Sequence, residues 1–336
     1  MAAVDDLTDA VKQLAAGAGF ARAGVAPAGP LPADCRRRFE GWLAGGNHAA
    51  MTYLSRDVQK RFDPSAVVEG ARGVICLAAA YAPPDDPADC DAFVARYARG
   101  RDYHKVLKRR CRDLMDRIRT VEPKFEGRAF VDSGRLAERS LAAAAGLGWI
   151  GRNGCLVVPG LGSYVVLAEI VCNLPLRPGK PLEPQCGDCR ACLDACSAGA
   201  CLGDGTIDAR RCASYLTIEH DGDIDVRRRP AMGNCVFGCD RCQEVCPHNR
   251  NLPAGDGELA GRRGMNPAEI LGWSADDWDA ATRGSAMRRA SREQFVRNAA
   301  IAAGNSGKAI YRPCLLEAKR RLPKLAEVIE WAVGRL

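Results

Sequence analysis

This chain carries the run Cys186-Gly-Asp-Cys189-Arg-Ala-Cys192-Leu-Asp-Ala-Cys196 and, further along, the run Cys239-Asp-Arg-Cys242-Gln-Glu-Val-Cys246-Pro247. Three cysteines spaced three residues apart reach three corners of one iron–sulfur cube, and the next cysteine ligates a neighbouring cube. The spacing therefore predicts two [4Fe–4S] clusters and a one-electron relay. One cluster would be held by Cys186, Cys189, Cys192 and Cys246, and the other by Cys196, Cys212, Cys239 and Cys242.

Zinc and disulfides are the alternative interpretations of these cysteines. Structural zinc suits two Cys-x-x-Cys pairs, whereas a third and a fourth cysteine in the same run are unusual for a tetrahedral site. Disulfides need an oxidising compartment. The segment from Met1 to Gly19 carries three aspartates and no apolar signal core, so we expect a cytoplasmic protein.

Length and composition are ordinary for a globular protein of two or three domains. The chain has 336 residues, of which 47% are hydrophobic and 26% are charged. The longest apolar stretch, Val74 to Ala82, is far too short to span a bilayer. We expect no membrane partner, and we expect a monomer.

The net charge of +7 is unevenly distributed. Residues 96–112 carry eight basic and one acidic residue, and residues 283–336 carry twelve basic and four acidic residues. Two basic regions on an acidic body indicate a polyanion such as nucleic acid, although solvated helix faces explain the same charges equally well.

Three regions follow from the order of motifs. Residues 1–175 alternate helical and strand patterns and predict an α/β domain, with a buried strand over 73–80 and a helix through Leu107, Leu114 and Ile118. Residues 155–158 and 164–172 are expected to form a strand pair. A proline-rich linker opens the ferredoxin-like cluster domain, residues 176–255, and residues 256–336 form a short helical tail like one unit of an α-solenoid.

The sequence Gly146-Leu-Gly148-Trp-Ile-Gly151 matches the dinucleotide fingerprint only in its letters. That fingerprint requires a strand before the glycines and a helix after them, and here the order is reversed. We therefore interpret the glycines as a sharp helix-to-strand turn. Without a dinucleotide site, the clusters would take their electrons from an external low-potential donor.

Asp132 lies at an expected strand end, before a helix predicted from Arg135. A carboxyl in this position can act as a general acid if burial raises its pKa. It can instead cap the following helix, and on the residues alone we favour the cap. The four histidines show no metal-ligand spacing, and each is interpreted as a surface or packing residue.

Several stretches together resemble the epoxyqueuosine reductase family. They are Tyr53-Leu-Ser-Arg56, Lys60-Arg-Phe-Asp-Pro64, Arg96-Tyr-Ala-Arg-Gly-Arg-Asp-Tyr-His104-Lys105, Val131-Asp-Ser133, Gly146-Leu-Gly-Trp-Ile-Gly151, Asp208-Ala-Arg-Arg-Cys-Ala-Ser-Tyr-Leu-Thr-Ile-Glu219 and Phe237-Gly-Cys-Asp-Arg-Cys-Gln243. The arginine-rich stretch and the segment after Cys212 are specific to this family among ferredoxin-like chains. The resemblance runs from about residue 5 to residue 250, and the tail resembles the family's HEAT-like helices more weakly.

The resemblance implies a reductive-dehalogenase-like N-terminal domain that holds cobalamin base-off near the first cluster. It also implies reduction of epoxyqueuosine to queuosine at the wobble position of a tRNA anticodon stem-loop, with Asp132 as proton donor. Asp132 is also counted with the cofactor-binding positions. The other positions that match cobalamin contacts are Arg56, Tyr97, Asn153, Ser163, Ser214, Cys239 and Asp240.

Three alternative functions remain. A reductive dehalogenase shares the cofactors but usually carries a twin-arginine export signal, which this chain lacks. A ferredoxin-like electron carrier would leave the N-terminal domain unexplained. A nucleic-acid-binding protein with structural clusters would show no turnover.

Overall fold

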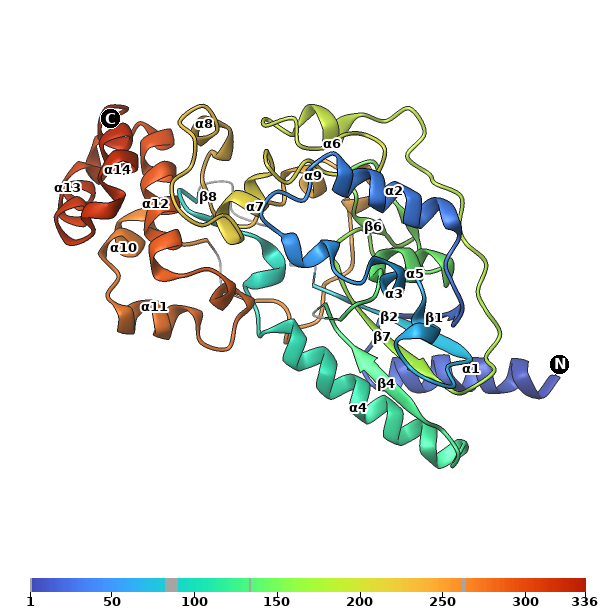
Figure 1. The fold of residues 1–336 in the computed structure, drawn as a ribbon. Helices are drawn as coiled ribbons and strands as arrows, with labels where there is room; N and C mark the ends of the chain where they lie inside the picture. Colours follow the sequence, from blue (N-terminus) through green and yellow to red (C-terminus); the bar gives the residue numbers. More distant parts are fainter. Residues whose placement is uncertain (1, 82–89, 133, 262–263) are drawn as a thin grey trace.

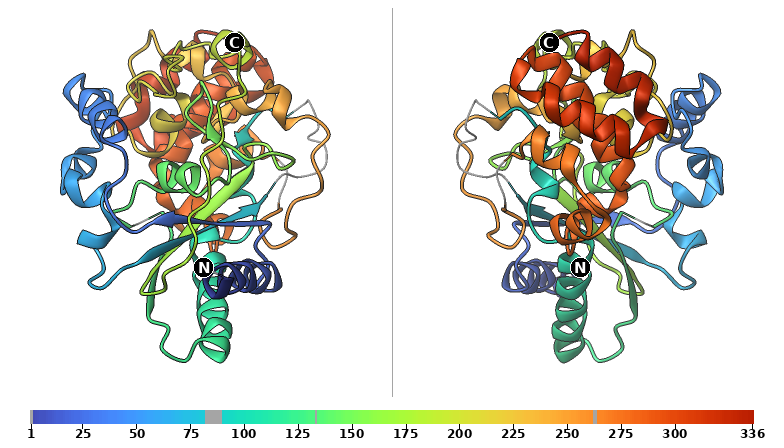
Figure 2. Two further views of the ribbon diagram at one scale, coloured as in Figure 1. Left: turned by 90° about the vertical axis from the view of Figure 1, so that its right-hand side faces the viewer. Right: turned by 90° about the vertical axis from the view of Figure 1, so that its left-hand side faces the viewer.

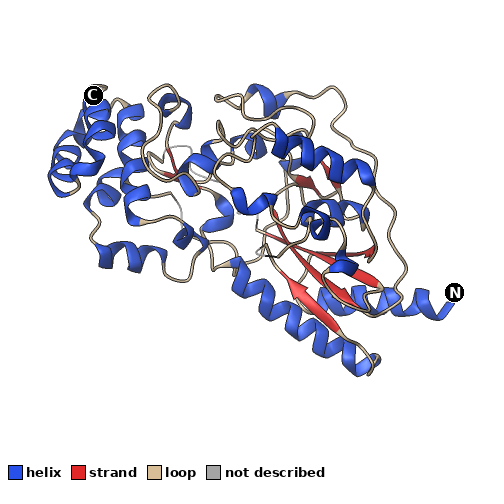
Figure 3. Ribbon diagram, viewed as in Figure 1, coloured by secondary structure: helices blue, strands red, loops and turns tan. Residues whose placement is uncertain are grey.

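The computed structural model describes residues 2–81, 90–132, 134–261 and 264–336. Ser133, part of the Val-Asp-Ser stretch, lies outside the described residues. The two termini lie at opposite ends of the molecule, with a sheet-containing part near the N-terminus and a helical part near the C-terminus (Figure 1). Figure 3 shows that the long strands all belong to the N-terminal part.

A four-stranded sheet forms the centre of the N-terminal part. Its strand order is β1 (Arg22–Pro27), β2 (Gly73–Ala80), β7 (Val165–Cys172) and β4 (Gly127–Phe130). All three pairings are antiparallel. Strand β2 is buried along its whole length, as its unbroken apolar run predicts. The α/β class is confirmed. Because β4 pairs antiparallel with β7, the tendency of ligands to bind at the carboxyl ends of parallel strands does not apply to the end of β4.

Helices cover both faces of this sheet. Ile75, Leu77 and Ala79 of β2 face α1 (Ala2–Gly17) and α4 (Tyr103–Val121), while the alternate residues of β2 face α5 (Glu138–Ala144). Figure 2 shows α1 and α4 together on one side of the sheet. The predicted apolar face of α4 is confirmed, because Leu107, Leu114 and Ile118 are fully buried there.

Two expectations about local structure need correction, and one is confirmed. Strand β6 (Leu156–Val157) pairs with β5 (Trp149–Ile150) rather than with β7, so the predicted strand pair does not form. Helix α5 begins at Glu138 rather than Arg135. The glycine turn is as expected: Gly146 has a φ of +78° after α5, and β5 follows.

The remainder of the N-terminal part consists of short helices. They are α2 (Ala33–Ala44), η1 (Thr52–Ser55), α3 (Val58–Arg61), η2 (Pro64–Ala66) and η3 (Arg96–Ala98). The cluster region contributes α6 (Ala191–Asp194), α7 (Ala213–Ile218), α8 (Arg229–Met232), α9 (Arg241–Glu244) and η4 (Pro247–Asn249). Its strand β8 (Cys235–Phe237) pairs with β3 (Phe93–Val94) of the N-terminal region.

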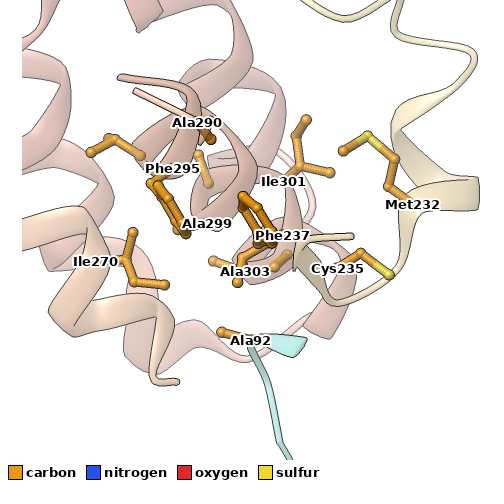
Figure 4. Packing of buried hydrophobic residues seen from close by; sticks show 14 of the residues in the cluster. Ala92, Met232, Cys235, Phe237, Ile270, Ala290, Phe295, Ala299, Ile301 and Ala303 are labelled. Carbon is orange, nitrogen blue, oxygen red and sulfur yellow. The ribbon is translucent and has the colours of Figure 1, made fainter. Parts of the chain in front are cut away.

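The C-terminal helices share one hydrophobic core with the cluster region. They are α10 (Pro267–Gly272), α11 (Ala275–Thr282), η5 (Ala286–Arg289), α12 (Arg292–Ser306), η6 (Ala309–Tyr311), α13 (Arg312–Arg321), η7 (Pro323–Leu325) and α14 (Ala326–Val333). Phe237 of β8 stacks on Phe295 of α12 with ring centroids 5.7 Å apart (Figure 4). The tail is therefore packed firmly against the region that carries the cysteines.

Candidate functional site

A cavity of about 920 Å³ opens where the three regions meet. Its wall combines residues of α2, the start of α4, the loop after β4, helix α7 and η5. Aromatic rings make up much of it, namely Phe39, Trp42, Tyr53, Phe62, Tyr97, Tyr103 and Tyr215. Of the residues predicted for the site, Tyr97, Asp132, Cys212 and Ser214 line this cavity.

Asp132 projects into the cavity from the loop that follows β4. Its φ of +54° is left-handed, a conformation that aspartate tolerates better than most residues. Its Oδ2 accepts a hydrogen bond from the hydroxyl of Tyr103 at 2.9 Å and lies 3.0 Å from Nε2 of His104. The capping interpretation of Asp132 was wrong, because the N-cap of α5 is Ala137.

His104 links Asp132 to a second carboxylate. Its Nδ1 lies 2.7 Å from Oδ1 of Asp102, the N-cap residue of α4. The pKa of His104 is raised, first by the hydrogen bond to Asp132 and then, against the effect of burial, by that to Asp102. Asp102 thus favours the protonated imidazole and holds its ring toward Asp132.

Burial does not raise the pKa of Asp132, which was the condition under which a carboxyl in this position could act as a general acid. The pKa is lowered, first by the hydrogen bond from His104, which outweighs burial, and further by that from Tyr103. In this arrangement Asp132 is a carboxylate and the neighbouring proton resides on His104. The interpretation of every histidine as a surface or packing residue therefore fails for His104.

Four of the predicted cluster ligands surround a second, separate cavity of about 250 Å³. Cys186, Cys189, Cys192 and Cys246 all line it, together with Asn153 and His248. We call these four cysteines the first set. Each ligand of an iron–sulfur cube binds a different iron, so the ligands must surround a space rather than meet at one point. The arrangement of the first set fits that requirement.

The other four predicted ligands, Cys196, Cys212, Cys239 and Cys242, are called the second set. They lie among further thiols: Cys201 hydrogen bonds with both Cys196 and Cys242, Cys155 with Cys242, and Cys235 with Cys239. Sequence spacing had not drawn attention to these three extra cysteines. Among the described residues, no three His, Cys, Asp or Glu side chains are grouped closely enough to hold a single metal ion.

The large cavity touches the second set and not the first. Cys212 forms part of its wall, whereas all four cysteines of the first set line the smaller cavity. The expectation that cobalamin lies near the first cluster stays a prediction, whereas a ligand in the large cavity would lie beside Cys212 of the second set.

The remaining predicted contact residues lie outside the cavity wall. Arg56 is exposed at the end of η1. Asn153 donates from Nδ2 to the carbonyl of Cys242 at 3.3 Å. Ser163 donates from Oγ to Oε1 of Gln243 at 3.0 Å and is buried.

Asp240, next to Cys239 of the second set, is also buried outside the cavity wall. It accepts the backbone N–H of Arg96 at 2.8 Å, and burial raises its pKa to about 6.

The structure adds residues to the site that sequence spacing had missed. Tyr103 and His104 contact the carboxylate of Asp132, and Glu138 accepts its backbone N–H. Arg289 lines the cavity and donates two hydrogen bonds of 2.8 Å to Glu219. Tyr103 and His104 belong to the arginine-rich stretch that carried the resemblance, which was the available signal for them.

Comparison with known proteins identifies the family. A family model described as "Epoxyqueuosine reductase QueG, DUF1730" matches residues 61–133, and one described as "4Fe-4S double cluster binding domain" matches residues 185–249. The epoxyqueuosine reductase of Pseudomonas aeruginosa is 41% identical over 307 residues, which cover 88% of this chain and 85% of that protein. The chain belongs to the epoxyqueuosine reductase family. It is an oxidoreductase.

Solved structures of epoxyqueuosine reductase share the whole fold. One with an epoxyqueuosine-modified tRNA-Tyr stem loop has a TM-score of 0.89 and 28% identity, covering 98% of this chain and 90% of the other. The Bacillus subtilis enzyme, with an aspartate catalytic loop swung out of its active site, has a TM-score of 0.86 and 26% identity, with the same coverage of 98% and 90%. In the described parts of this chain, no helix is long and apolar enough to cross a membrane.

Proposed function

We propose that this chain reduces epoxyqueuosine to queuosine at the wobble position of tRNA, using two [4Fe–4S] clusters and cobalamin. One observation carries the proposal. Asp132, a carboxylate with a proton on the adjacent His104, and Cys212, a predicted cluster ligand, face the same cavity. Electrons and protons can therefore converge on one bound substrate.

The cavity has the size and the lining of a site for a large organic ligand. Its volume of about 920 Å³ lies near the upper end of the ~300–1,000 Å³ range of ligand pockets. Aromatic rings offer flat apolar surfaces, while Tyr97 and Ser214 add polar groups at positions that match cobalamin contacts. When bound, cobalamin supplies a metal that accumulates reducing power from electrons delivered singly.

The residues of the chain supply one of the two protons that the reaction consumes, and the second comes from solvent. Loss of the epoxide oxygen as water, with formation of the alkene, consumes two electrons and two protons. Asp132 passes one proton from His104 to the epoxide oxygen, and Asp102 keeps His104 oriented and charged for that transfer. The aspartate catalytic loop of the Bacillus subtilis enzyme supports this role for the loop that carries Asp132.

Substrate binding uses the basic regions at the mouth of the cavity. Helix α4 begins at the cavity wall with Tyr103 and His104, and Lys105, Lys108 and Arg112 are exposed along it. These cations can neutralise the phosphates of an anticodon stem-loop, and such binding weakens with salt. The target base must leave its stack to reach Asp132. The relative bound to a modified stem loop supports tRNA as the partner.

Not every basic residue counted in the sequence is available to RNA. Arg297 is 1% exposed and donates to the carbonyls of Leu216, His220 and Gly222. Its charge stabilises the junction between α7 and α12. The excess of positive charge in residues 283–336 is therefore partly structural.

We place the reaction in the cytoplasm, with an external low-potential donor reducing the clusters and the enzyme acting as a monomer. Cluster thiolates and a tRNA substrate both suit a reducing compartment.

The test is mass spectrometry of tRNA nucleosides from a strain that lacks this chain and any second enzyme for the step. We expect epoxyqueuosine to replace queuosine, and the wild-type chain but not Asp132→Asn to restore queuosine. Unchanged queuosine in that strain would refute the proposal.

A further inference from the structure

Glu169 is a buried carboxyl that the mechanism above does not use. It lies in the middle of β7, opposite Cys76 of β2 on one side and Phe130 of β4 on the other. Its neighbours Ala168 and Ile170 face α1 and α4, so Glu169 points to the opposite face of the sheet, toward α5. Its exposure is 0%, and in the described chain no N–H or hydroxyl group donates to either carboxylate oxygen.

Glu138, the first residue of α5, is the partner of Glu169. Its carboxyl group lies close enough to that of Glu169 for the two charges to interact. Two buried carboxylates that share a site cannot both be ionised, so one of them carries a proton. Burial, followed by the charge of Asp132, raises the pKa of Glu138 to about 7, and burial raises the pKa of Glu169 well above its ordinary value.

The charged and titratable groups around this pair do not remove the need for that proton. Arg61 and His104 face Glu138, and Cys76 of β2 faces Glu169. Neither arginine nor histidine reaches Glu169 with a hydrogen bond in the described structure.

Glu138 also holds the backbone of the proposed proton donor. Its Oε1 accepts the backbone N–H of Asp132, the residue with left-handed φ. Residues in sparsely populated conformations persist only where surrounding contacts determine them. The chain of contacts therefore runs from the sheet through Glu169 and Glu138 to the peptide of Asp132.

We propose that Glu138, fixed by a proton shared with Glu169, is a positioning residue that locks Asp132 in the left-handed conformation in which it meets His104 and Tyr103. This inference rests on the proposed function. Removing the lock leaves Asp132 its carboxyl group, but it lets the loop after β4 leave the productive geometry. The loss should appear in kcat rather than in the KM for tRNA.

The test compares two substitutions at position 138 in the holoenzyme. Glu138→Ala should lower kcat by about 10²-fold with the KM for stem-loop RNA within about threefold, since a misplacement of about 1 Å costs that much. Glu138→Gln should stay within about threefold of wild type, because its amide oxygen accepts from Asp132 and its NH₂ donates to Glu169. Glu126→Ala, at an exposed carboxylate outside the cavity, is the matched control.

Three results would overturn the proposal. Full activity of Glu138→Ala would show that Asp132 needs no lock. Loss of activity in Glu138→Gln equal to that in Glu138→Ala would mean that the proton of Glu138, rather than its hydrogen bonds, matters. A rise in KM alone would place Glu138 in RNA binding.

Two further measurements do not depend on turnover. The infrared carbonyl band of a protonated carboxyl should be present in wild type at neutral pH and lost in Glu169→Gln. A crystal structure of Glu138→Ala should show Asp132 released from its positive φ. If the wild-type enzyme leaves epoxyqueuosine unchanged, the proposed function fails, whereas an unchanged infrared band or an unmoved Asp132 refutes only the lock.

Discussion

Replacing Asp132 with asparagine removes the carboxyl group that passes the proton from His104, while leaving the shape of the site intact. Asparagine also tolerates the left-handed conformation that Asp132 adopts at a φ of +54°. Its side-chain oxygen can still accept from the hydroxyl of Tyr103 and from Nε2 of His104, now 2.9 and 3.0 Å from the carboxylate. The variant therefore separates proton delivery from folding and from cofactor binding.

The expected loss follows from the general acid role and from the openness of the site. A positioned acid contributes about 10²–10⁴-fold to a rate. The side chain of Asp132 is 57% exposed to the cavity, so water can replace part of the proton supply when the acid is absent. We therefore expect the lower half of the range, about 10²–10³-fold in kcat, which corresponds to roughly 3–4 kcal/mol of activation free energy.

The assay is single-turnover reduction of an epoxyqueuosine-modified stem-loop RNA by the pre-reduced holoenzyme, with queuosine quantified by mass spectrometry. Tyr103→Phe is the matched comparison, because it removes one hydrogen bond to Asp132 and keeps the acid. A hydrogen bond to a charged group contributes about 1.5–3 kcal/mol, and His104 still binds the carboxylate, so this variant should lose about tenfold, near the lower end of that range.

Two outcomes would refute the reasoning about Asp132. Turnover of Asp132→Asn within about threefold of wild type would exclude a general acid, whose smallest expected contribution is about 10²-fold. An Asp132→Asn enzyme that has lost its iron or its cobalamin would show that the residue acts in assembly of the site instead.

Three other predictions concern the proton, the clusters and the core. Asp102→Asn removes a carboxylate that raises the pKa of His104, so His104 should lose its proton at lower pH. The fall of kcat on the alkaline side should then move to lower pH. An unchanged pH profile would exclude His104 as the proton source. Cys242→Ala should halve the iron content, and undiminished iron would refute the ligand assignment. Phe295→Ala, fully buried, should lower stability by about 3–5 kcal/mol in chemical unfolding, and a loss below ~1 kcal/mol would contradict the shared core.

Local pattern determined a large part of this structure. The unbroken apolar run of β2, the helical spacing of Leu107, Leu114 and Ile118, and the glycine turn at Gly146 all form as predicted. Each depends on neighbouring residues in the chain and on burial of one face, which are properties that sequence periodicity reports directly. The spacing of Cys186, Cys189 and Cys192 is local in the same sense, and the family model confirms a double-cluster domain there.

Strand pairing was predicted less well because it depends on partners that are distant in the chain. Strand β6 was expected beside β7 and instead pairs with β5. A strand of two residues carries almost no information about its partner, so packing against neighbouring elements decides the pairing.

The chemistry of the site was decided by tertiary structure alone. Asp132 and Glu169 lie on elements far in the chain from their partners, which are His104 and Glu138 respectively. The pKa of each group depends on the charges that folding brings near it and on how far folding removes it from water. Sequence could identify Asp132 as a candidate but could not give the direction of its pKa shift, because that direction depends on a hydrogen bond from His104 that outweighs burial. The sequence determines which residues can carry out the chemistry, whereas their protonation states depend on contacts that form only in the folded chain.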